Sequence, residues 1–509
     1  MRGGKAKGKR KKAKGKGQKG RGRRQKVKGK REEGEGKRKK AKGKRKKAKG
    51  KREKLYVRSK KRGAGYGREN KRSDGCQRGS GHSCSDLLII GGGAAGMCSA
   101  FAARKMARSQ GIGDEQFVIT ILERNSSVGA KIRISGGGRC NITHAGPVKD
   151  LLQKGFQRKV EQRFLRHALH AFSNEDVRAM LATCGVETAA RDDGKVFPVS
   201  RNAGDVLEAF QSMLRNARVY LVTGERVTRA ERLEEGFRVA SEGREHTCRF
   251  LVLATGGVSY RHTGTTGDGL DIAVSLGHSV VKPSPALAPI YLKPPPPPEL
   301  VGVSLRGTGL RVQCSGTAVS RNGDVLITHK GVSGPACLSL SVDAALLLNS
   351  HGKGELTLDF FPDHSSEDVA VLLLRHAEAH GSQFIRKYLQ AQQAIPSAMV
   401  PYVMLQAGID RQEKWGSLTK KARRSLQRTL KDFSLGWLKS IPLDAGEVSA
   451  GGVALQEIHP GTMESRVCSD LFLCGELLDY TGEVGGFNLQ AAFSTGWLAG
   501  SSIRYPVQA

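Results

Sequence analysis

The stretch DLLIIGGGAAG, residues 86–96, decides how the fold of this chain begins. Five residues typical of a buried strand run directly into a glycine-rich turn, in which Gly91, Gly93 and Gly96 form the pattern G-x-G-x-x-G. Residues 94–108 then continue as a predicted helix. The first glycine permits a tight turn, the second lets the backbone approach a pyrophosphate, and the third lets helix and strand pack closely. Because the helix N-terminus would face the phosphates, the stretch predicts a dinucleotide-binding unit.

A second strand ending in an acid supports this prediction. Residues 117–123, FVITILE, form another buried run whose last residue, Glu123, is placed to accept hydrogen bonds from an adenosine ribose. Glu123 lies 27 residues past Gly96, where the usual spacing is about 20. The segment GIGDEQ, residues 111–116, accounts for the difference as a local insertion. The alternative is a glycine-rich turn that holds no ligand.

Later segments favour FAD over NAD as the tightly held cofactor. RFLVLATGG (249–257) is a third hydrophobic strand running into a glycine turn, as in flavoproteins whose chain returns under the cofactor. DLFLCGE (470–476) is a further buried strand ending in Gly-Glu, which can hold a ribitol hydroxyl. GEVGGFNLQ (482–490) and the apolar helix AAFSTGWLAG (491–500) follow, and their N–H groups can face a flavin edge. The first and last parts of the chain therefore build one site.

These motifs make the chain resemble the BaiN/YhiN-like family of NAD(P)/FAD-dependent oxidoreductases, some of whose members are called aminoacetone oxidase. Ser259-Tyr260-Arg261 stands where the family usually has Ser-Tyr-Pro, which bears on the loop conformation and on substrate preference. The resemblance runs in family order over residues 86–505 and does not include the tail. The matching segments are IIGGGAAG (89–96), GAKIRISGGGRCNIT (129–143), GKVFPVSRNAGDVL (194–207), LATGGVSYRHTGTTGDGLDIAVSLGH (253–278), VLITHKGVSGPACLSLS (325–341), EVSAGGVALQEI (447–458), TMESRV (462–467) and LFLCGELLDYTGEVGGFNLQAAFSTG (471–496).

The resemblance implies an α/β fold, a two-dinucleotide-type FAD-binding Rossmann-like domain with an inserted small β-barrel and an inserted helical bundle. Strand-like runs such as DVLITH support the barrel, and the apolar periodicity of residues 365–380 and 422–438 supports the bundle. The expected parts are a tail and linker (1–85), the first part of the FAD-binding domain (86–282), the barrel (283–362), the helical domain (363–440) and the C-terminal part of the FAD-binding domain (441–509).

The segment SGGGRCN, residues 135–141, is the most unusual part of the predicted site. Its glycines permit close backbone approach, and Arg139 and Asn141 can donate hydrogen bonds to a flavin or its phosphates. A purely structural turn is the alternative. The predicted cofactor-binding residues are Gly91, Gly93, Ala94, Ala95, Gly96, Glu123, Arg124, Lys131, Ser135, Gly136, Gly137, Arg139, Cys140, Asn141, Thr255, Gly256, Gly257, Asp268, Gly475, Glu476, Gly485, Gly486, Asn488 and Leu489.

The sequence does not single out a catalytic residue, but it offers three candidates. Tyr260 and His262 follow the ATGG turn, and His262 can transfer protons near neutral pH. Cys140 is a candidate redox thiol, although it has no neighbouring cysteine in the sequence and buried packing is the expected role. No metal site is expected, because the histidine pairs at 167/170 and 376/380 lack a third ligand.

The positive charge of the chain is concentrated in its first 85 residues. They hold 38 Lys+Arg and 6 Asp+Glu, a net charge of +32, whereas the other 424 residues carry only +6. With few hydrophobic residues the tail is expected to be disordered and to bind polyanions nonspecifically. A targeting segment and a poorly constrained extension outside the natural protein are the alternatives. The near-neutral remainder excludes a simple basic nucleic-acid-binding domain.

The cysteines and the apolar runs indicate in which cellular compartment the protein is expected. The ten cysteines are scattered and form no C-x-x-C pair, so we expect neither a zinc site nor a disulfide framework. No run of 18 apolar residues and no N-terminal apolar signal are present. We therefore expect a soluble intracellular protein without a membrane span, in the cytoplasm or an organelle such as a plastid rather than the nucleus.

The favoured function is that of an FAD-dependent oxidoreductase that transfers a hydride between a small organic substrate and the flavin. NAD(P)H or oxygen would close the cycle. No second G-x-G-x-x-G motif is evident, so NAD(P)H would bind only transiently, as a co-substrate. One alternative is a flavoenzyme that acts on RNA. Another is a nucleic-acid-associated protein whose flavin domain is structural.

Overall fold

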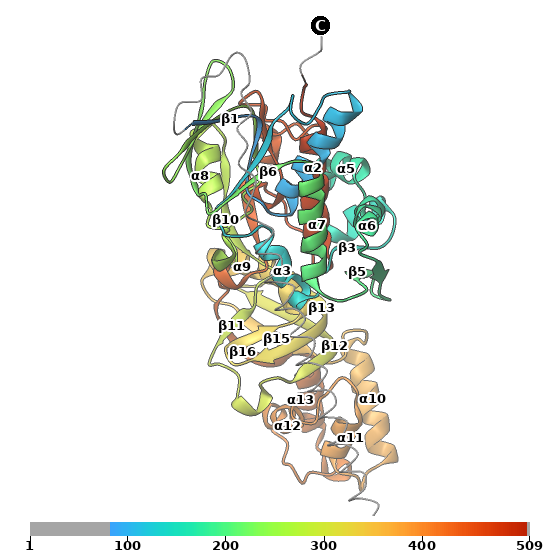
Figure 1. Cartoon of the computed structure of the whole chain (residues 1–509). Helices are drawn as coiled ribbons and strands as arrows, with labels where there is room; N and C mark the ends of the chain where they lie inside the picture. Colours follow the sequence, from blue (N-terminus) through green and yellow to red (C-terminus); the bar gives the residue numbers. More distant parts are fainter. Residues whose placement is uncertain (1–81, 506–509) are drawn as a thin grey trace, which may run out of the picture. The chain divides into compact units, whose positions relative to one another are not determined.

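The computed structural model describes residues 82–505. These residues lie within one compact unit, Gln77–Ala509 (Figure 1). The predictions about the basic tail concern residues outside the described part, except that residues 82–85, expected to belong to the linker, form the start of a strand. Between residues 82 and 505, no helix is long and apolar enough to cross a membrane.

A seven-stranded sheet forms the centre of the first domain. Its strands are β1 (His82–Ile90), β2 (Ile119–Glu123), β6 (Tyr220–Thr223), β7 (Val227–Arg232), β8 (Phe237–Ser241), β9 (Glu245–Leu253) and β18 (Leu471–Leu473). Their order is β6-β2-β1-β9-β8-β7, and β18 pairs with β9. β1 runs parallel to β2 and β9, with Ile90 opposite both Leu122 and Leu253. The carboxyl ends of these strands therefore meet at one edge of the sheet, where such folds bind ligands.

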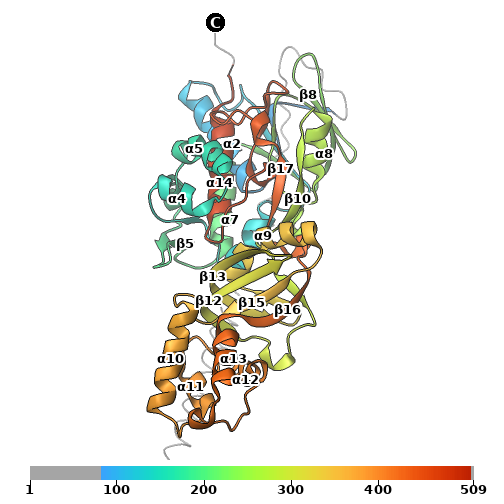
Figure 2. The same ribbon diagram turned by 180° about the vertical axis from the view of Figure 1, so that it is seen from behind.

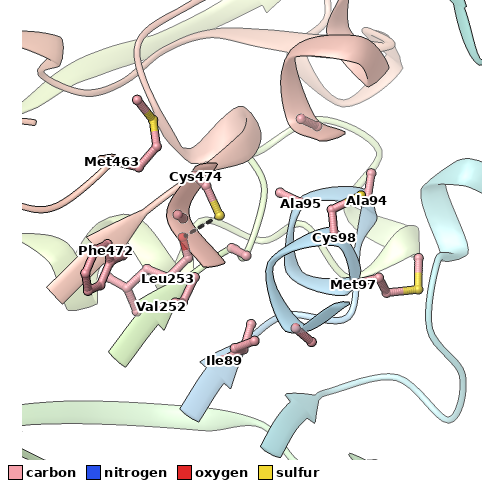
Figure 3. Packing of buried hydrophobic residues seen from close by; sticks show 14 of the residues in the cluster. Ile89, Ala94, Ala95, Met97, Cys98, Val252, Leu253, Met463, Phe472 and Cys474 are labelled. Carbon is pink, nitrogen blue, oxygen red and sulfur yellow. Dashed lines mark hydrogen bonds between the residues drawn. The ribbon is translucent and has the colours of Figure 1, made fainter. Parts of the chain in front are cut away.

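Two helices from opposite ends of the chain pack beside this sheet, α2 (Ala94–Ser109) and α14 (Phe487–Ser501). Figure 3 shows Cys98 of α2 close to Leu253 of β9 and Cys474, all of them buried. A Cβ at Gly496 or Gly500 of α14 would overlap a backbone carbonyl oxygen of α2. The two helix backbones are therefore in direct contact, and this contact joins the N-terminal and C-terminal parts of the domain.

The remaining elements of the first domain surround this sheet. The helices are α3 (Ala130–Gly138), α4 (Val148–Gly155), α5 (Lys159–Ala171), α6 (Asn174–Thr183), α7 (Ala203–Asn216) and α8 (Asp268–Ser275). The strands are β3 (Thr143–His144), β4 (Thr188–Ala190), β5 (Lys195–Pro198), β10 (Val280–Ala286) and β17 (Val448–Val453). β3, β5 and β4 form a small antiparallel sheet, and β10 pairs with β17 where the chain leaves the domain and returns to it.

The segment between β10 and β17 forms a closed barrel and a group of helices (Figure 2). The barrel strands are β11 (Ile290–Lys293), β12 (Ser304–Cys314), β13 (Thr317–Thr328), β14 (Gly331–Ser333), β15 (Glu355–Asp359) and β16 (Phe433–Ser440). The helices are α9 (Pro335–His351), α10 (Ser366–Ala379), α11 (Ile385–Ala391), α12 (Val400–Ala407) and α13 (Lys420–Lys431). Barrel and helices share one buried hydrophobic cluster, separate from that of the first domain. The predicted fold class is confirmed.

One predicted helix is too long. The periodicity of residues 422–438 predicted a single helix, but α13 ends at Lys431 and residues 433–440 form β16. β16 pairs with β15 on one side and β11 on the other, and so closes the barrel. Gly436 within it has a φ of 118°, which a helix does not contain. The pairing with strands about 75 and 145 residues earlier overrides the local helical pattern.

Candidate active site

A cavity of about 500 Å³ opens at the carboxyl edge of the parallel strands. The turn after β1, the end of β2, helix α3, the loop after β9 and the start of α14 all line it. Leu287, Glu447 and Val448 line it from the connections to the barrel. Segments more than 350 residues apart in the sequence thus meet around one space, as the sequence predicted.

The cavity brings together nearly all of the residues predicted to bind a cofactor. Only three of them do not line it, namely Gly96, Cys140 and Gly257. A Cβ at Gly96 would overlap the carbonyl oxygen of Gly91, and one at Gly257 would overlap the Ser449 hydroxyl. These two glycines allow close packing behind the cavity wall and are not positioned to touch a ligand.

The turn before α2 has the properties of a phosphate site. A Cβ at Gly93 would project into open space, with no atom within 4 Å. α2 has no side-chain cap, so its first N–H groups point to the cavity without an acceptor among the described residues. The buried Thr255 hydroxyl, which also lines the cavity, has no hydrogen-bond partner in the described part of the chain. A buried hydroxyl normally has one, so these groups fit the pyrophosphate of FAD.

Glu123 lies beside this turn, at the end of β2. Its carboxylate accepts hydrogen bonds from the backbone N–H groups of Gly92 and Asn125, both at 2.8 Å. Each carboxylate oxygen can accept a second hydrogen bond. The side chain is therefore held in a fixed orientation at the cavity wall, where it can still accept the ribose hydroxyls that the sequence assigned to it.

Asp268, at the start of α8, is held by two arginines. Its carboxylate pairs with Arg226 at 2.8 Å and with Arg124 at 3.3 Å. The hydrogen bond from Arg226 lowers the pKa of Asp268, which therefore stays ionised. Arg226 was not among the predicted residues, because the β7 sequence carries no motif. The three charges form a rigid cluster on the Glu123 side of the cavity.

Lys131 and Glu476 form a second charged pair. Their Nζ and Oε2 atoms are 2.6 Å apart, and Lys131 also donates to the Ser259 hydroxyl at 2.8 Å. The other oxygen of Glu476 accepts from the backbone N–H of Ser449 at 3.0 Å. Glu476 was expected to hold a ribitol hydroxyl, but most of its hydrogen-bonding capacity is used within the protein, and it fixes the direction of Lys131.

The SGGG segment is part of a kinked helix rather than a simple turn. Ser135, Gly136 and Gly137 interrupt α3 with non-helical backbone angles, and the two glycines have positive φ values. In the orientation that satisfies its amide, Asn141 accepts a hydrogen bond from the Gly486 N–H at 2.9 Å and donates to backbone carbonyls. Asn141 thus positions the start of α14 at the cavity.

The three catalytic candidates differ in position. Cys140 is fully buried, and burial raises the pKa of its thiol to about 11, so it is a packed, protonated side chain. His262 is exposed and does not line the cavity. Tyr260 does line it and stands next to Glu447, an acid that was not among the predicted residues.

Tyr260 and Glu447 differ from the other polar groups of the cavity in their hydrogen bonding. Among residues 82–505, neither the Tyr260 hydroxyl nor the Glu447 carboxylate makes a hydrogen bond. Burial, and then the nearby charge of Glu447, raises the pKa of Tyr260. Burial raises the pKa of Glu447, and Lys131 partly opposes this. As a whole residue Glu447 is exposed, whereas Tyr260 is half-buried, and both line the cavity.

The backbone of Tyr260 is strained. Its φ of 48° and ψ of 54° lie in the left-handed region, where a non-glycine aromatic residue is unusual. The Thr263 N–H and hydroxyl both donate to the Tyr260 carbonyl, at 2.7 and 2.8 Å, and hold it there. The neighbouring Arg261 pairs with Asp444 at 3.1 Å and joins the two loops that carry Tyr260 and Glu447. Such strain is common at functional sites.

Two arginines line the cavity beside β5. Arg139 and Arg191 lie over the ring of Phe197, at 5.8 and 5.9 Å from its centroid. Both are exposed. They provide cations on this side of the cavity, where an anionic group of a ligand can bind.

The sequence contained a signal for Glu447. It is the first residue of the family-like segment EVSAGGVALQEI, and it directly precedes β17. Because Glu447 is far from the glycine motif along the chain, its sequence position did not indicate that it belongs to the same site. The β10–β17 pairing and the Arg261–Asp444 ion pair bring the Glu447 and Tyr260 loops together.

Comparisons with known proteins agree with this geometry. A family model described as HI0933-like protein Rossmann domain matches residues 85–502. A 3-dehydro-bile acid delta(4,6)-reductase of Clostridium scindens is 30% identical over 412 residues, which are 81% of this chain and 97% of the relative. A ribosomal RNA dihydrouridine synthase of Escherichia coli is 28% identical over 417 residues, 81% of this chain and 96% of the relative.

Solved structures also match this chain. The 3-ketosteroid delta1-dehydrogenase of Sterolibacterium denitrificans is 13% identical, with a TM-score of 0.43, covering 82% of this chain and 99% of that chain.

Proposed function

This chain belongs to the HI0933-like family of Rossmann-domain proteins and is a flavin-dependent oxidoreductase, and we propose that it reduces a carbon–carbon double bond conjugated to a carbonyl group. The single observation that carries the proposal is the cavity with two different sides. One side has the open phosphate cradle at Gly93 and the Glu123 carboxylate. The other has the unbonded hydroxyl of Tyr260 and carboxyl of Glu447.

The residues of the cradle would hold FAD. The α2 N–H groups would bind its pyrophosphate, Glu123 would accept from its ribose, and the start of α14, held by Asn141, would face its ring with free N–H groups. When bound, FAD supplies a hydride to the substrate. Everything else the reaction needs must come from the protein or the solvent, above all a proton.

Tyr260 and Glu447 are the proposed source of that proton. Hydride addition to one carbon of a conjugated double bond leaves negative charge on the neighbouring carbon and the carbonyl oxygen. The Tyr260 O–H bond breaks as its proton forms the new C–H bond, and the Glu447 carboxyl returns a proton to the phenolate oxygen. Both groups keep their protons to higher pH than usual, because burial disfavours their charged forms.

The names of the relatives support this substrate class. A delta(4,6)-reductase and a dihydrouridine synthase both saturate a carbon–carbon double bond. Hydride adds only to an electron-poor carbon, which conjugation to a carbonyl provides. Arg139 and Arg191 favour a small organic substrate that also carries an anionic group.

Anaerobic half-reactions test the proposal. The purified, yellow protein is mixed with NADH or NADPH, and the flavin absorbance is followed; we expect one of the two to bleach it. Cyclohexenone is then added as a simple conjugated ketone. Recovery of the oxidised flavin spectrum with formation of cyclohexanone supports the proposal, whereas recovery only after oxygen is admitted would contradict it.

Uridine in ribosomal RNA is a second candidate substrate, favoured by the dihydrouridine synthases among the relatives. Its pyrimidine double bond is also conjugated to a carbonyl, so the same residues would act. The reduced protein is offered a ribosomal RNA transcript in place of cyclohexenone. Flavin reoxidation with dihydrouridine in the RNA, and none with free uridine, would favour RNA over a small molecule.

A further inference from the structure

Helix α13, in the group of helices beside the barrel, has an unusual composition. Its sequence KKARRSLQRTLK contains six basic residues and no acidic one. Leu426, Thr429 and Leu430 are buried and fix its apolar side against the barrel and neighbouring helices. The basic residues must therefore occupy the rest of the helix surface. Residues 363–440 carry 12 Lys+Arg and 7 Asp+Glu, so their net charge of +5 is nearly all of the +6 outside the tail.

Most of these cations have no carboxylate partner. Lys431 pairs with Asp359 at 2.7 Å and donates to the Phe361 carbonyl at 2.8 Å. Among the described residues, the other five make no ion pair or side-chain hydrogen bond; they are Lys420, Lys421, Arg423, Arg424 and Arg428. Surface arginines elsewhere, such as Arg158 and Arg232, do have acidic partners.

This arrangement works against the helix itself. Lys420 and Lys421 stand in the first turn, where the helix dipole disfavours positive charge. Lys420, Arg424 and Arg428 are spaced four residues apart, so like charges lie next to each other on one face. Only Arg428 and Lys431, in the last turn, are favourable to the helix dipole. Local conflicts of this kind are expected where a residue serves a function.

The cations line a groove rather than a flat surface. Between α13 and the barrel is a space of about 530 Å³, lined by Arg424, Gln427, Arg428 and Lys431 from the helix and by Arg311 from β12. Arg311, Arg424 and Arg428 are exposed. Asp432 and the already paired Asp359 are the only acids that line it. Figures 1 and 2 both show α13 directly beside the barrel strands.

We propose that α13 and Arg311 form a binding site for the phosphate backbone of RNA, separate from the cavity and from the N-terminal tail. Twelve helical residues span about 18 Å, which is long enough for several phosphates, whereas a single free phosphate would need only one arginine pair. A lipid surface is disfavoured because the apolar side of α13 is buried and cannot enter a bilayer. The site does not depend on the redox reaction proposed above.

The test removes three groove cations, Arg311→Gln, Arg424→Gln and Arg428→Gln, in one full-length protein. The matched control removes three exposed cations of α5, Lys159→Gln, Arg163→Gln and Arg166→Gln. Binding of polyuridylate is measured over a range of salt concentrations, and also for a chain that starts at Gln77, since Gln77–Ala509 is a compact unit that the relatives match nearly end to end. An equal FAD content and melting temperature show that the variants are folded.

In the chain that starts at Gln77, we expect the groove variant to bind polyuridylate at least about tenfold more weakly at low salt, with a log–log salt slope shallower by about 2, because three phosphate contacts are lost. In the full-length protein the loss is smaller, because the tail also binds polyanions. The α5 control should match the wild type. An equal loss in the two variants, or no loss in either, would overturn the proposal. It would also be overturned if polyglutamate or vesicles of anionic lipid competed with polyuridylate at equal charge, since the groove would then serve an acidic protein or a membrane.

Discussion

The two sides of the cavity differ in how their polar groups are held. On the nucleotide side, Glu123 accepts two backbone N–H groups, and Asp268 is fixed between two arginines. On the other side, the Tyr260 hydroxyl and the Glu447 carboxyl make no hydrogen bond to any described residue. Both sides lie within one cavity, in which Glu123 is buried, Asp268 and Tyr260 are half-buried and Glu447 is exposed.

This difference separates binding from chemistry. Groups with partners keep one charge state and one position, as a tightly bound cofactor requires. Groups without partners can exchange a proton with a reacting molecule, and their raised pKa values keep the proton available. Changes on the nucleotide side should therefore alter FAD content, and changes on the other side should alter turnover while FAD remains bound.

The largest effect is expected at Gly93. Gly93→Val should abolish FAD binding, because the side chain would occupy the open space that the pyrophosphate needs. FAD released by denaturation measures the content. Gly113→Val is the control, since Gly113 lies in an exposed turn without positive φ and its Cβ would meet only the flexible Gln116 side chain. A yellow Gly93→Val protein would show that the motif is not the cradle.

Glu447 should affect turnover and its pH dependence. Its pKa is raised, so the carboxyl group stays protonated below that pKa, and acid-dependent turnover is lost as the pH rises through it. Lys131 and Tyr260 face the Glu447 carboxyl group. The pKa of Tyr260 lies higher, so Tyr260 does not alter this descending limb of the pH–turnover profile. Glu447→Gln should lower turnover about 10²-fold and remove the limb. An unchanged limb would assign it to another group.

Glu123 should have a smaller effect, on the other side of the cavity. Glu123→Ala should weaken FAD binding by roughly 1–3 kcal/mol, the usual range for hydrogen bonds to a charged group. Equilibrium titration of the apoprotein with FAD measures this. Turnover at saturating FAD should stay close to that of the wild type, and a large loss at full occupancy would contradict the separation of the two sides.

The smallest effect on turnover is expected from the tail. Deleting residues 1–76, which precede the compact unit, removes a net charge of +31 and no residue of the cavity. Turnover should not change, whereas most of the salt-sensitive retention on heparin should disappear. The salt dependence of retention that remains should come from the α13 groove. Lost turnover with FAD still bound would mean that the tail takes part in the reaction.

The nucleotide side could be predicted from the sequence because its signals are local. A strand, three glycines and a helix within 25 residues are sufficient to identify the cradle, and Glu123 follows at the end of the next strand. Arg226, Glu447 and β16 could not be predicted in this way. Glu447 and β16 reach their positions through the β10–β17 and β11–β16 pairings of segments far apart in the chain, and Arg226 stands before β7 without a motif of its own.

The contact between α2 and α14 shows the same limit. Glycines were expected where a ligand approaches the backbone, but Gly496 and Gly500 instead allow one helix to touch another. Both uses require glycine, and the sequence alone does not distinguish them. Gly96 and Gly257 were both included among the cofactor-binding residues although they lie behind the cavity wall. The close helix–strand packing expected of Gly96 is what the structure shows.

The separation of the two sides is tested most directly by single-turnover kinetics of Tyr260→Phe. The variant and the wild type are reduced under anaerobic conditions with dithionite and mixed with cyclohexenone, and flavin reoxidation is followed. We expect equal FAD content and a reoxidation rate lower by about 10²- to 10⁴-fold in the variant, the usual contribution of a positioned acid. Equal reoxidation rates in the two proteins, or loss of FAD from the variant, would contradict the account.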